Sequence, residues 1–429
     1  MTAQTPAQTL AQKIIAHAAG RQSVAPGEIV TCRVDLAMMH DSGGPRRVKP
    51  MLEKLGAKVW DPDKVVVITD HYLPANDDES RRIIRIAREW VKEAGVTRFH
   101  DGVGICHVVL PQKGYLQPGM FAVGGDSHSP TGGAFGAYMF GIGATEMLGV
   151  LVTGEIWLKV PHTILVEWSG KLGPAVSAKD MMLALCGRLG LDGGQYQAIQ
   201  YAGEAILALP MQERMTLCNM APEVGAQTGL VAPDHLTRAY LESVQSAGAA
   251  SLDFSAWQGD PGAPLLAHHH FDAATLDPQV AAPHSPANAA QVARHAGTRI
   301  DTAYIGACTG AKIEDLRMAA SMLKGRRVAE NVRFVVAPAS AHDQALAARE
   351  GTLQILVDAG AELLANSCGI CAGYGDDRLG ENEIAITSTA RNFKGRMGAA
   401  SSQVYLASPF TVAASAIAGS ICDPREFLK

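Results

Sequence analysis

Three cysteines in the last third of the chain constrain its fold more than any other feature. Cys308 lies in the run A-Y-I-G-A-C-T-G-A-K, and sixty residues later Cys368 and Cys371 form the C-x-x-C of N-S-C-G-I-C-A-G. A [4Fe–4S] cluster is normally held by four thiolates. Three thiolates would leave one iron with an open position, which suits a Lewis acid that coordinates substrate. The alternatives are a redox pair and a structural zinc site, which would need a fourth ligand.

The length and charge of the chain limit the classes of protein to which it can belong. With 429 residues, it is long enough for about two to four domains and a large buried core. Its 37 basic and 42 acidic residues give a formal charge of −5, which argues against a nucleic-acid partner. The one basic run, residues 324–327, is expected to be the solvated end of a helix.

Cysteine usage and the N-terminal segment indicate a reducing compartment. Eight cysteines in a chain of this length do not form a disulfide framework. Residues 1–10 lack the basic and apolar regions of a signal peptide, so we expect a cytoplasmic protein. Four further cysteines have apolar neighbours and are expected to be small buried residues: Cys106, Cys186, Cys218 and Cys422.

Two apolar segments are long enough to raise the question of a membrane. Residues 134–153 contain four glycines and Glu146, and residues 404–422 contain Ser408-Pro409, which is typical of a helix start. We expect both segments to form buried helices, the second a shorter one that ends near Gly419. No membrane association is predicted.

Strand-like and helix-like segments alternate along the chain. Residues 64–69 are a β-branched run typical of a buried strand, and residues 78–95 show a helical apolar period ending in glycine. A strand at 163–168 and a helix at about 177–190 repeat the pattern, which favours doubly wound α/β layers. An Ala-, Pro-, Gly- and His-rich stretch places a connection near residue 285. The predicted domains are 1–160, 161–285 and 286–429.

The glycine-rich stretch at 124–143 does not predict nucleotide binding. In G-I-G-A-T-E, Glu146 occupies the position of the third glycine of the dinucleotide fingerprint, and no G-x-x-x-x-G-K-[ST] occurs.

Acid–histidine pairs follow apolar strands at two places. Asp70-His71 comes after the strand at 64–69, and Asp126-Ser127-His128 follows F-A-V-G-G. A carboxylate beside a histidine sets its tautomer and raises its basicity, and α/β sheets gather their sites at strand ends. Together with His107, these pairs predict a proton-handling site, although a lone histidine is more often structural.

Two further pairs carry weaker signals. Asn219 and Glu223 are four residues apart and would share one face of a helical turn. Arg391 and Arg396 flank a short aromatic turn, where bidentate guanidinium groups suit carboxylates; the alternative is a surface ion pair.

Together these segments resemble the aconitase superfamily, and specifically its branch of large subunits of 3-isopropylmalate dehydratase and homoaconitase. The resemblance implies three α/β domains around a [4Fe–4S] cleft, with the fourth, mobile domain on a separate small subunit. The matching motifs are T-D-H, G-I-C-H, G-G-D-S-H-S-P-T-G-G-A-F-G-A, C-N-M-x-x-E, P-Q-V-A-A-P-H-S-P, I-G-A-C-T-x-x-K-I-E-D-L-R, C-G-I-C-A-G, A-R-N-F-K-G-R-M-G and V-Y-L-A-S-P.

The resemblance also implies a role for each matching residue. His71, paired with Asp70, would protonate the departing hydroxyl, and Glu223 would assist at that group. The implied cluster ligands are Cys308, Cys368 and Cys371; the implied catalytic residues are Asp70, His71, His107, Asp126, His128 and Glu223; the implied substrate-binding residues are Arg391, Arg396, His40 and Ser127.

The implied reaction is dehydration and rehydration of a small hydroxy di- or tricarboxylic acid, first of all the interconversion of 2- and 3-isopropylmalate. This chemistry needs a Lewis acid, a proton donor and a base for the α-carbon proton. The family's base is a serine in an S-S-R motif of the fourth domain. Here Ser401-Ser402 is followed by Gln403, so we expect a small-subunit partner to supply the base.

Three positions depart from the family pattern. Gly310 and Ala390 replace asparagines, and Lys312 replaces an arginine, at places near the cluster that tune its affinity and potential. A divergent relative acting on another substrate is therefore an alternative, such as a homoaconitase or a hydratase of a maleate-, citraconate- or dimethylmalate-type diacid. A non-catalytic iron- or RNA-binding descendant is a further alternative, but the complete Asp, His and Arg set argues against it.

Overall fold

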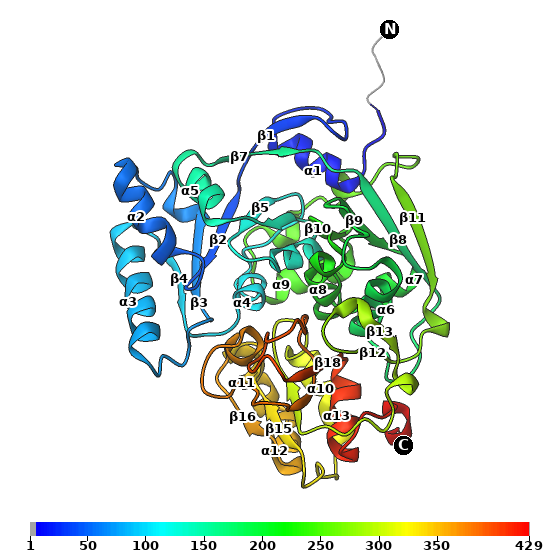
Figure 1. The fold of residues 1–429 in the computed structure, drawn as a ribbon. Helices are drawn as coiled ribbons and strands as arrows, with labels where there is room; N and C mark the ends of the chain where they lie inside the picture. Colours follow the sequence, from blue (N-terminus) through cyan, green and yellow to red (C-terminus); the bar gives the residue numbers. More distant parts are fainter. Residues whose placement is uncertain (1–5, 429) are drawn as a thin grey trace.

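The computed structural model describes residues 6–428 and consists of mixed α/β layers (Figure 1). Residues 1–5, which belong to the segment expected to lack a signal peptide, lie outside this range. No helix within residues 6–428 is long and apolar enough to cross a membrane. The cysteines expected to be buried, Cys106, Cys186, Cys218 and Cys422, are buried.

A five-stranded parallel sheet with the strand order β4-β3-β2-β5-β6 forms the first layer. Helices α2 and α3 cover its outer face at the left of Figure 1. In β3 and β2 neighbouring residues face two different hydrophobic cores, as the two-residue period of a strand requires: Val65 and Val67 face one, Val66 and Ile68 the other. The bounds are β2 Leu36–His40, β3 Val65–Thr69, β4 Arg98–Asp101, β5 Phe121–Gly124, β6 Tyr138–Gly141, α2 Pro45–Leu55, α3 Asp78–Glu93, α4 Cys106–Gln112 and α5 Ala144–Thr153.

A second parallel sheet of four strands has the order β10-β9-β8-β11. A two-stranded antiparallel ribbon of β1 and β7 leads into it, and α1 packs beside the ribbon (Figure 1). The predicted helix at 177–190 is α6, with Ser177 and Gly190 as its caps. The bounds are α1 Leu10–Ala18, β1 Ile29–Arg33, β7 Glu155–Lys159, β8 Thr163–Ser169, α6 Ala178–Leu189, β9 Ala198–Ala202, α7 Glu204–Ala208, α8 Met211–Asn219, β10 Thr228–Val231, α9 His235–Ser243 and β11 Ala267–Asp272.

The third sheet has seven strands in the order β13-β12-β18-β17-β14-β15-β16. Strands β12 and β13 lie on either side of residue 285 and pair with each other in this sheet. The domain boundaries at 160 and 285 stay a prediction. The bounds are β12 Gln279–Ala281, β13 Ala289–Gln291, β14 Thr302–Ile305, α10 Ile313–Leu323, β15 Arg333–Val336, α11 Ala341–Arg349, α12 Thr352–Ala359, β16 Glu362–Leu363, β17 Ile384–Thr387, β18 Gln403–Ala407 and α13 Pro409–Ala418.

Three local expectations need correction. Residues 134–153 are not one helix: Gly136, with φ 70°, ends a 3-10 turn, and β6 and α5 follow. Residues 404–422 begin with strand β18, although the helix α13 starts after its cap Ser408 and ends at Gly419 as expected. Asn219 ends α8 and a separate 3-10 turn carries Glu223, so the two do not share a helical face.

Candidate active site

A cavity of about 330 Å³ lies between the first and the third sheet. The first sheet contributes residues that follow the carboxyl ends of β2, β3 and β5, which is where parallel sheets commonly place their sites. The third sheet contributes the loops after β14, β16 and β17. The lining residues are His40, Ser42, Gly43, Arg47, His71, His107, Gly125, Asp126, Ser127, His128, Cys308, Cys368, Cys371, Ala372, Tyr374, Arg391 and Arg396.

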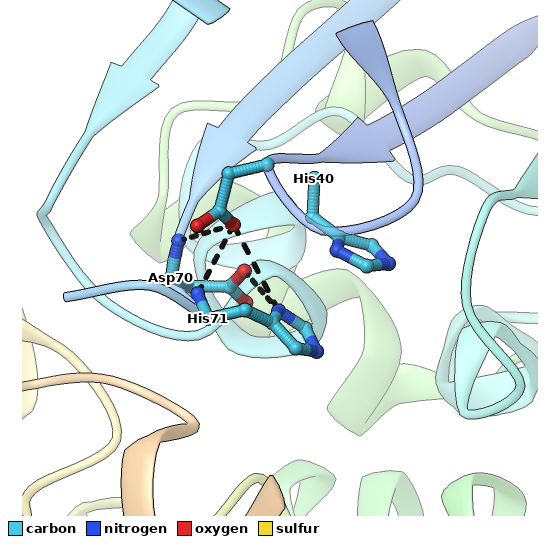
Figure 2. Close-up of side chains that lie close together, drawn as sticks. His40, Asp70 and His71 are labelled. Carbon is cyan, nitrogen blue, oxygen red and sulfur yellow. Dashed lines mark hydrogen bonds and ion pairs between the residues drawn. The ribbon is translucent and has the colours of Figure 1, made fainter. Parts of the chain in front are cut away.

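His71 forms a buried ion pair with its neighbour Asp70. The Nδ1 of His71 lies 2.7 Å from Asp70 Oδ1 (Figure 2). The other carboxylate oxygen of Asp70 accepts a hydrogen bond from the Cys106 amide at 2.7 Å. Burial lowers the pKa of His71, but attraction to Asp70 and their hydrogen bond outweigh it, and the pKa rises to about 10. His71 is therefore protonated at neutral pH.

Asp41 fixes the backbone that carries this pair. Its buried carboxylate accepts hydrogen bonds from three successive amides, those of Asp70 at 3.1 Å, His71 at 3.0 Å and Tyr72 at 2.7 Å. His40 stacks on the ring of His71 with centroids 4.1 Å apart (Figure 2). Burial and repulsion by His71 lower the pKa of His40.

Asp126 is the second acidic centre of the cavity. Its Oδ1 lies 2.7 Å from His107 Nε2 and accepts the His128 amide at 2.8 Å. Its Oδ2 lies 3.8 Å from His40 Nε2 and 4.0 Å from His71 Nε2. Burial favours a raised pKa for Asp126, but attraction to His107 and their hydrogen bond hold the pKa well below its usual value.

His128 is part of a different arrangement, in which one carboxylate serves two partners. Glu223 Oε1 lies 3.0 Å from His128 Nε2 and accepts from Arg391 Nε at 2.7 Å. Arg391 also donates through Nη1 to Ser127 Oγ at 2.8 Å. Burial and repulsion by Arg391 lower the pKa of His128 to about 4 in spite of Glu223, so this imidazole is neutral.

The three predicted ligand cysteines are buried and line the same cavity. The loop of Cys368 is tied to the first sheet because its amide donates to the Asp70 carbonyl at 2.8 Å. Asn219 donates to Cys308 Sγ at 3.2 Å. Burial raises the pKa of the Cys308 thiol to about 12.

The surroundings of these thiols fit a metal–sulfur group. Among residues 6–428, the buried Nε of Arg396 and Oδ1 of Asn219 have no hydrogen-bond partner. Soft thiolate ligands select iron–sulfur clusters or zinc, and three of them leave a coordination position open. Two groups of His and Asp side chains each bring ligand atoms within 4.8 Å of one another. In the first group Asp70 is already hydrogen-bonded to His71, and in the second Asp126 is hydrogen-bonded to His107.

Comparison with known proteins agrees with this geometry. The family model for "Aconitase family (aconitate hydratase)" matches residues 12–297 and 292–419. The chain belongs to the aconitase family. It is 44% identical to 3-isopropylmalate dehydratase large subunit 1 of Methanopyrus kandleri, over 98% of this chain and 100% of that one. It is 41% identical to a probable methanogen homoaconitase large subunit of Methanothermobacter thermautotrophicus, over 97% of each chain. A 3-isopropylmalate dehydratase large subunit of Moorella thermoacetica is also 41% identical, over 98% and 99%.

The structure brings all the sequence-predicted residues of this aconitase-family chain to one place. All but two line the cavity; Asp70 and Glu223 stand behind it and hold His71, His128 and Arg391. Sequence reasoning missed Ser42, Arg47 and Tyr374, which also line it, and did not give Asp41 its supporting role. The signal for Arg47 was its place in P-R-R, which follows His40-Asp41 after three further residues.

Two of the three departures from the aconitase-family pattern have a structural reason. A Cβ at Gly310 would lie 2.1 Å from Ser388 Oγ, so Ser388 occupies the space that an asparagine side chain would need. Buried Lys312 donates to the Cys308 carbonyl at 3.0 Å and pairs with Asp315 at 2.7 Å, so it still supports the cysteine loop. Nothing around buried Ala390 explains the loss of its asparagine.

Proposed function

We propose that this chain is the large subunit of a [4Fe–4S]-dependent hydro-lyase acting on a small hydroxy di- or tricarboxylic acid. The observation that carries the proposal is the shared cavity, in which three buried cysteines lie beside two acid–histidine pairs and three arginines. Aconitase-family membership supports the reaction class. A protein of this kind suits a reducing compartment, so we expect it in the cytoplasm.

Cys308, Cys368 and Cys371 would hold the cluster. When bound, a three-cysteine cluster supplies an iron with an open position, which acts as a Lewis acid on a hydroxyl group. The residues around it do the positioning and the proton transfer. No fourth cysteine among residues 6–428 lines this cavity.

His71 is the proposed proton donor to the departing hydroxyl. Asp70 keeps its imidazole protonated and turns Nε2 toward the cavity, since Nδ1 is engaged at 2.7 Å. Asp126 and His107 form the second pair, which we propose orients the hydroxyl or water. Neutral His128 and Glu223 assist at the same group and position Arg391.

Arg391 and Arg396 are the proposed carboxylate-binding residues. Arg391 uses two donors on Glu223 and Ser127, which fixes the plane of its guanidinium group and leaves the remaining donors for substrate. Ser127 and His40 complete this part of the wall. A fixed fork suits a planar carboxylate better than a point charge does.

The base for the α-carbon proton is proposed to come from a small subunit. Ser401 and Ser402 do not line the cavity: Ser401 Oγ bonds to Glu381, and Ser402 Oγ donates to the Ala399 carbonyl at 2.7 Å. The relatives are named as large subunits. We therefore propose a partner that carries the lid domain, with a Ser-Ser-Arg motif.

The relatives' names point to two substrate types. 3-Isopropylmalate dehydratases support interconversion of 2- and 3-isopropylmalate, and homoaconitases support a hydroxy tricarboxylic acid. Identities of 44% and 41% do not separate the two.

Metal analysis of protein purified without oxygen tests the proposal. We expect a brown protein with about four irons and four sulfides per chain. It should dehydrate a hydroxy acid when combined with its small subunit. One tightly bound zinc without sulfide would contradict the cluster.

A further inference from the structure

Arg47 is a cation of the cavity wall that the reaction described above does not use. It lies in the first turn of α2, whereas Arg391 and Arg396 come from the loop after β17. It therefore reaches the cavity from the first sheet. Its side chain is exposed, as expected for a residue facing an open site.

The guanidinium group of Arg47 is unpaired, in contrast to that of its neighbour. Arg46 donates from Nε to the Ser42 carbonyl at 2.7 Å and lies over the ring of Tyr72, 5.2 Å from its centroid. Arg47 has no ion pair and no side-chain hydrogen bond with any residue from 6 to 428. All five of its donors are available to a ligand.

The cavity offers a substrate no aliphatic side chain larger than alanine. Among residues 6–428, no Val, Leu, Ile, Met or Phe lines it, and its carbon-rich side chains are those of Ala372 and Tyr374. A buried alkyl group gains about 0.8 kcal/mol per CH₂ only where it meets apolar atoms. A carboxylate beside Arg47 would instead meet the cation of that residue and Ser42, near the start of α2.

We propose that Arg47 binds a third carboxylate of the substrate, so that this site prefers hydroxy tricarboxylic acids to acids that carry a branched alkyl group at that position. The inference rests on the proposed hydro-lyase function and selects among its substrates. Three guanidinium groups from two elements then face three carboxylates. Arg47 acts on substrate specificity, separately from the proton transfer at His71.

Binding of two matched probes to the cluster-loaded chain tests this inference. Propane-1,2,3-tricarboxylate and 2-isopropylbutanedioate both lack the reacting hydroxyl and differ in one carboxymethyl against one isopropyl group. Anaerobic calorimetry should show the tricarboxylate bound at least about tenfold more tightly. Arg47→Ala should remove this preference while leaving 2-isopropylbutanedioate affinity unchanged, and Arg47→Lys should restore part of it.

Lys54→Ala is the matched control, since Lys54 is an exposed cation in the last turn of the same helix. It should leave both affinities unchanged. Equal affinity of the wild-type chain for both probes, tighter binding of 2-isopropylbutanedioate, or an equal loss for both probes in Arg47→Ala would overturn the inference.

Turnover separates this inference from the proposed function. With the small subunit present, the kcat/KM ratio of homocitrate to 3-isopropylmalate should exceed one and fall in Arg47→Ala. A pair that dehydrates 3-isopropylmalate better, with no effect of Arg47→Ala, would overturn the role of Arg47 and keep the hydro-lyase. A chain with zinc and no turnover on any acid would overturn both.

Discussion

Single carboxylates set the charge of the histidines in the cavity. Asp70 serves His71 alone as an ion-pair partner, and the pKa of that imidazole rises to about 10. Glu223 is shared between His128 and Arg391, and burial with the added positive charge lowers the pKa of His128 to about 4. One histidine is thus protonated and the other neutral at pH 7, a difference that their surroundings create.

Arg391→Lys should cost more than the retained charge suggests. A lysine cannot hold Glu223 at 2.7 Å and Ser127 at 2.8 Å and still present a planar fork to substrate. We expect kcat/KM of the reconstituted enzyme to fall. The decrease should correspond to a loss of transition-state stabilisation on the order of 2–4 kcal/mol. Steady-state kinetics on the best substrate measure it, and unchanged values would show that Arg391 does not bind the substrate.

Asp41→Asn tests the support beneath His71. An asparagine places an NH₂ group against one of the three amides that the carboxylate accepts, so at least one bond is lost. We expect a stability loss of about 1.5–3 kcal/mol and a kcat lower by about tenfold or more.

Asp35→Asn is the control for this variant. Asp35 also accepts a backbone amide, that of Phe121 at 2.9 Å, but just before β2 and outside the cavity lining. It should lose stability with kcat unchanged. An equal drop of kcat in both variants would show that Asp41→Asn lowers kcat only through a general effect on folding.

At the scale of elements, the loop between β14 and α10 is packed against the loop after β17. Ser388 Oγ accepts the Gly306 amide at 3.0 Å and lies where any side chain at position 310 would go. The two loops therefore need a glycine at 310 as long as Ser388 is present. This contact links Cys308 to the segment that carries Arg391.

Gly310→Ala should destabilise the chain by about 1–3 kcal/mol through overpacking, and lower the iron retained after purification. The comparison is Gly149→Ala within α5, where an added Cβ meets nothing within 4 Å. That change should stabilise the chain by about 0.5–1 kcal/mol. Urea unfolding measures both, and a neutral Gly310→Ala would show that Ser388 can move aside.

At the scale of the whole molecule, the first and the third sheet line one cavity, and the base for the α-carbon proton is proposed to come from a small subunit. We expect the chain alone to be inactive and to recover hydro-lyase activity with its small subunit. Loss of a general base typically costs about 10²–10⁴-fold in rate, and an open site keeps water around each charge.

The assay compares the chain with and without its partner on 2-isopropylmalate, homocitrate, citramalate, dimethylmalate and maleate, following alkene absorbance. Full turnover by the chain alone would refute the prediction that a second subunit is required. A lack of turnover by the chain and its partner on every acid would favour a non-catalytic role.

The sequence by itself determined which residue types the proposed chemistry uses. Cys308, the C-x-x-C pair and the acid–histidine pairs lie in short motifs. The residue types and the spacing of each motif can be recognised from a few neighbouring positions. Short-range signals likewise predicted β3, α3, α6 and α13, the last of these from its start signal Ser408-Pro409 and its end near Gly419.

Only the tertiary structure decided how these groups share their partners. Asp41 holds amides 29 to 31 residues away, and Arg391 meets Glu223 across 168 residues. The requirement for glycine at 310 comes from Ser388, and the place of Arg47 in the cavity from the packing of α2. Hydrogen bonds and steric contacts act over a few ångströms in space, so local sequence patterns do not contain pairings that packing creates between distant segments.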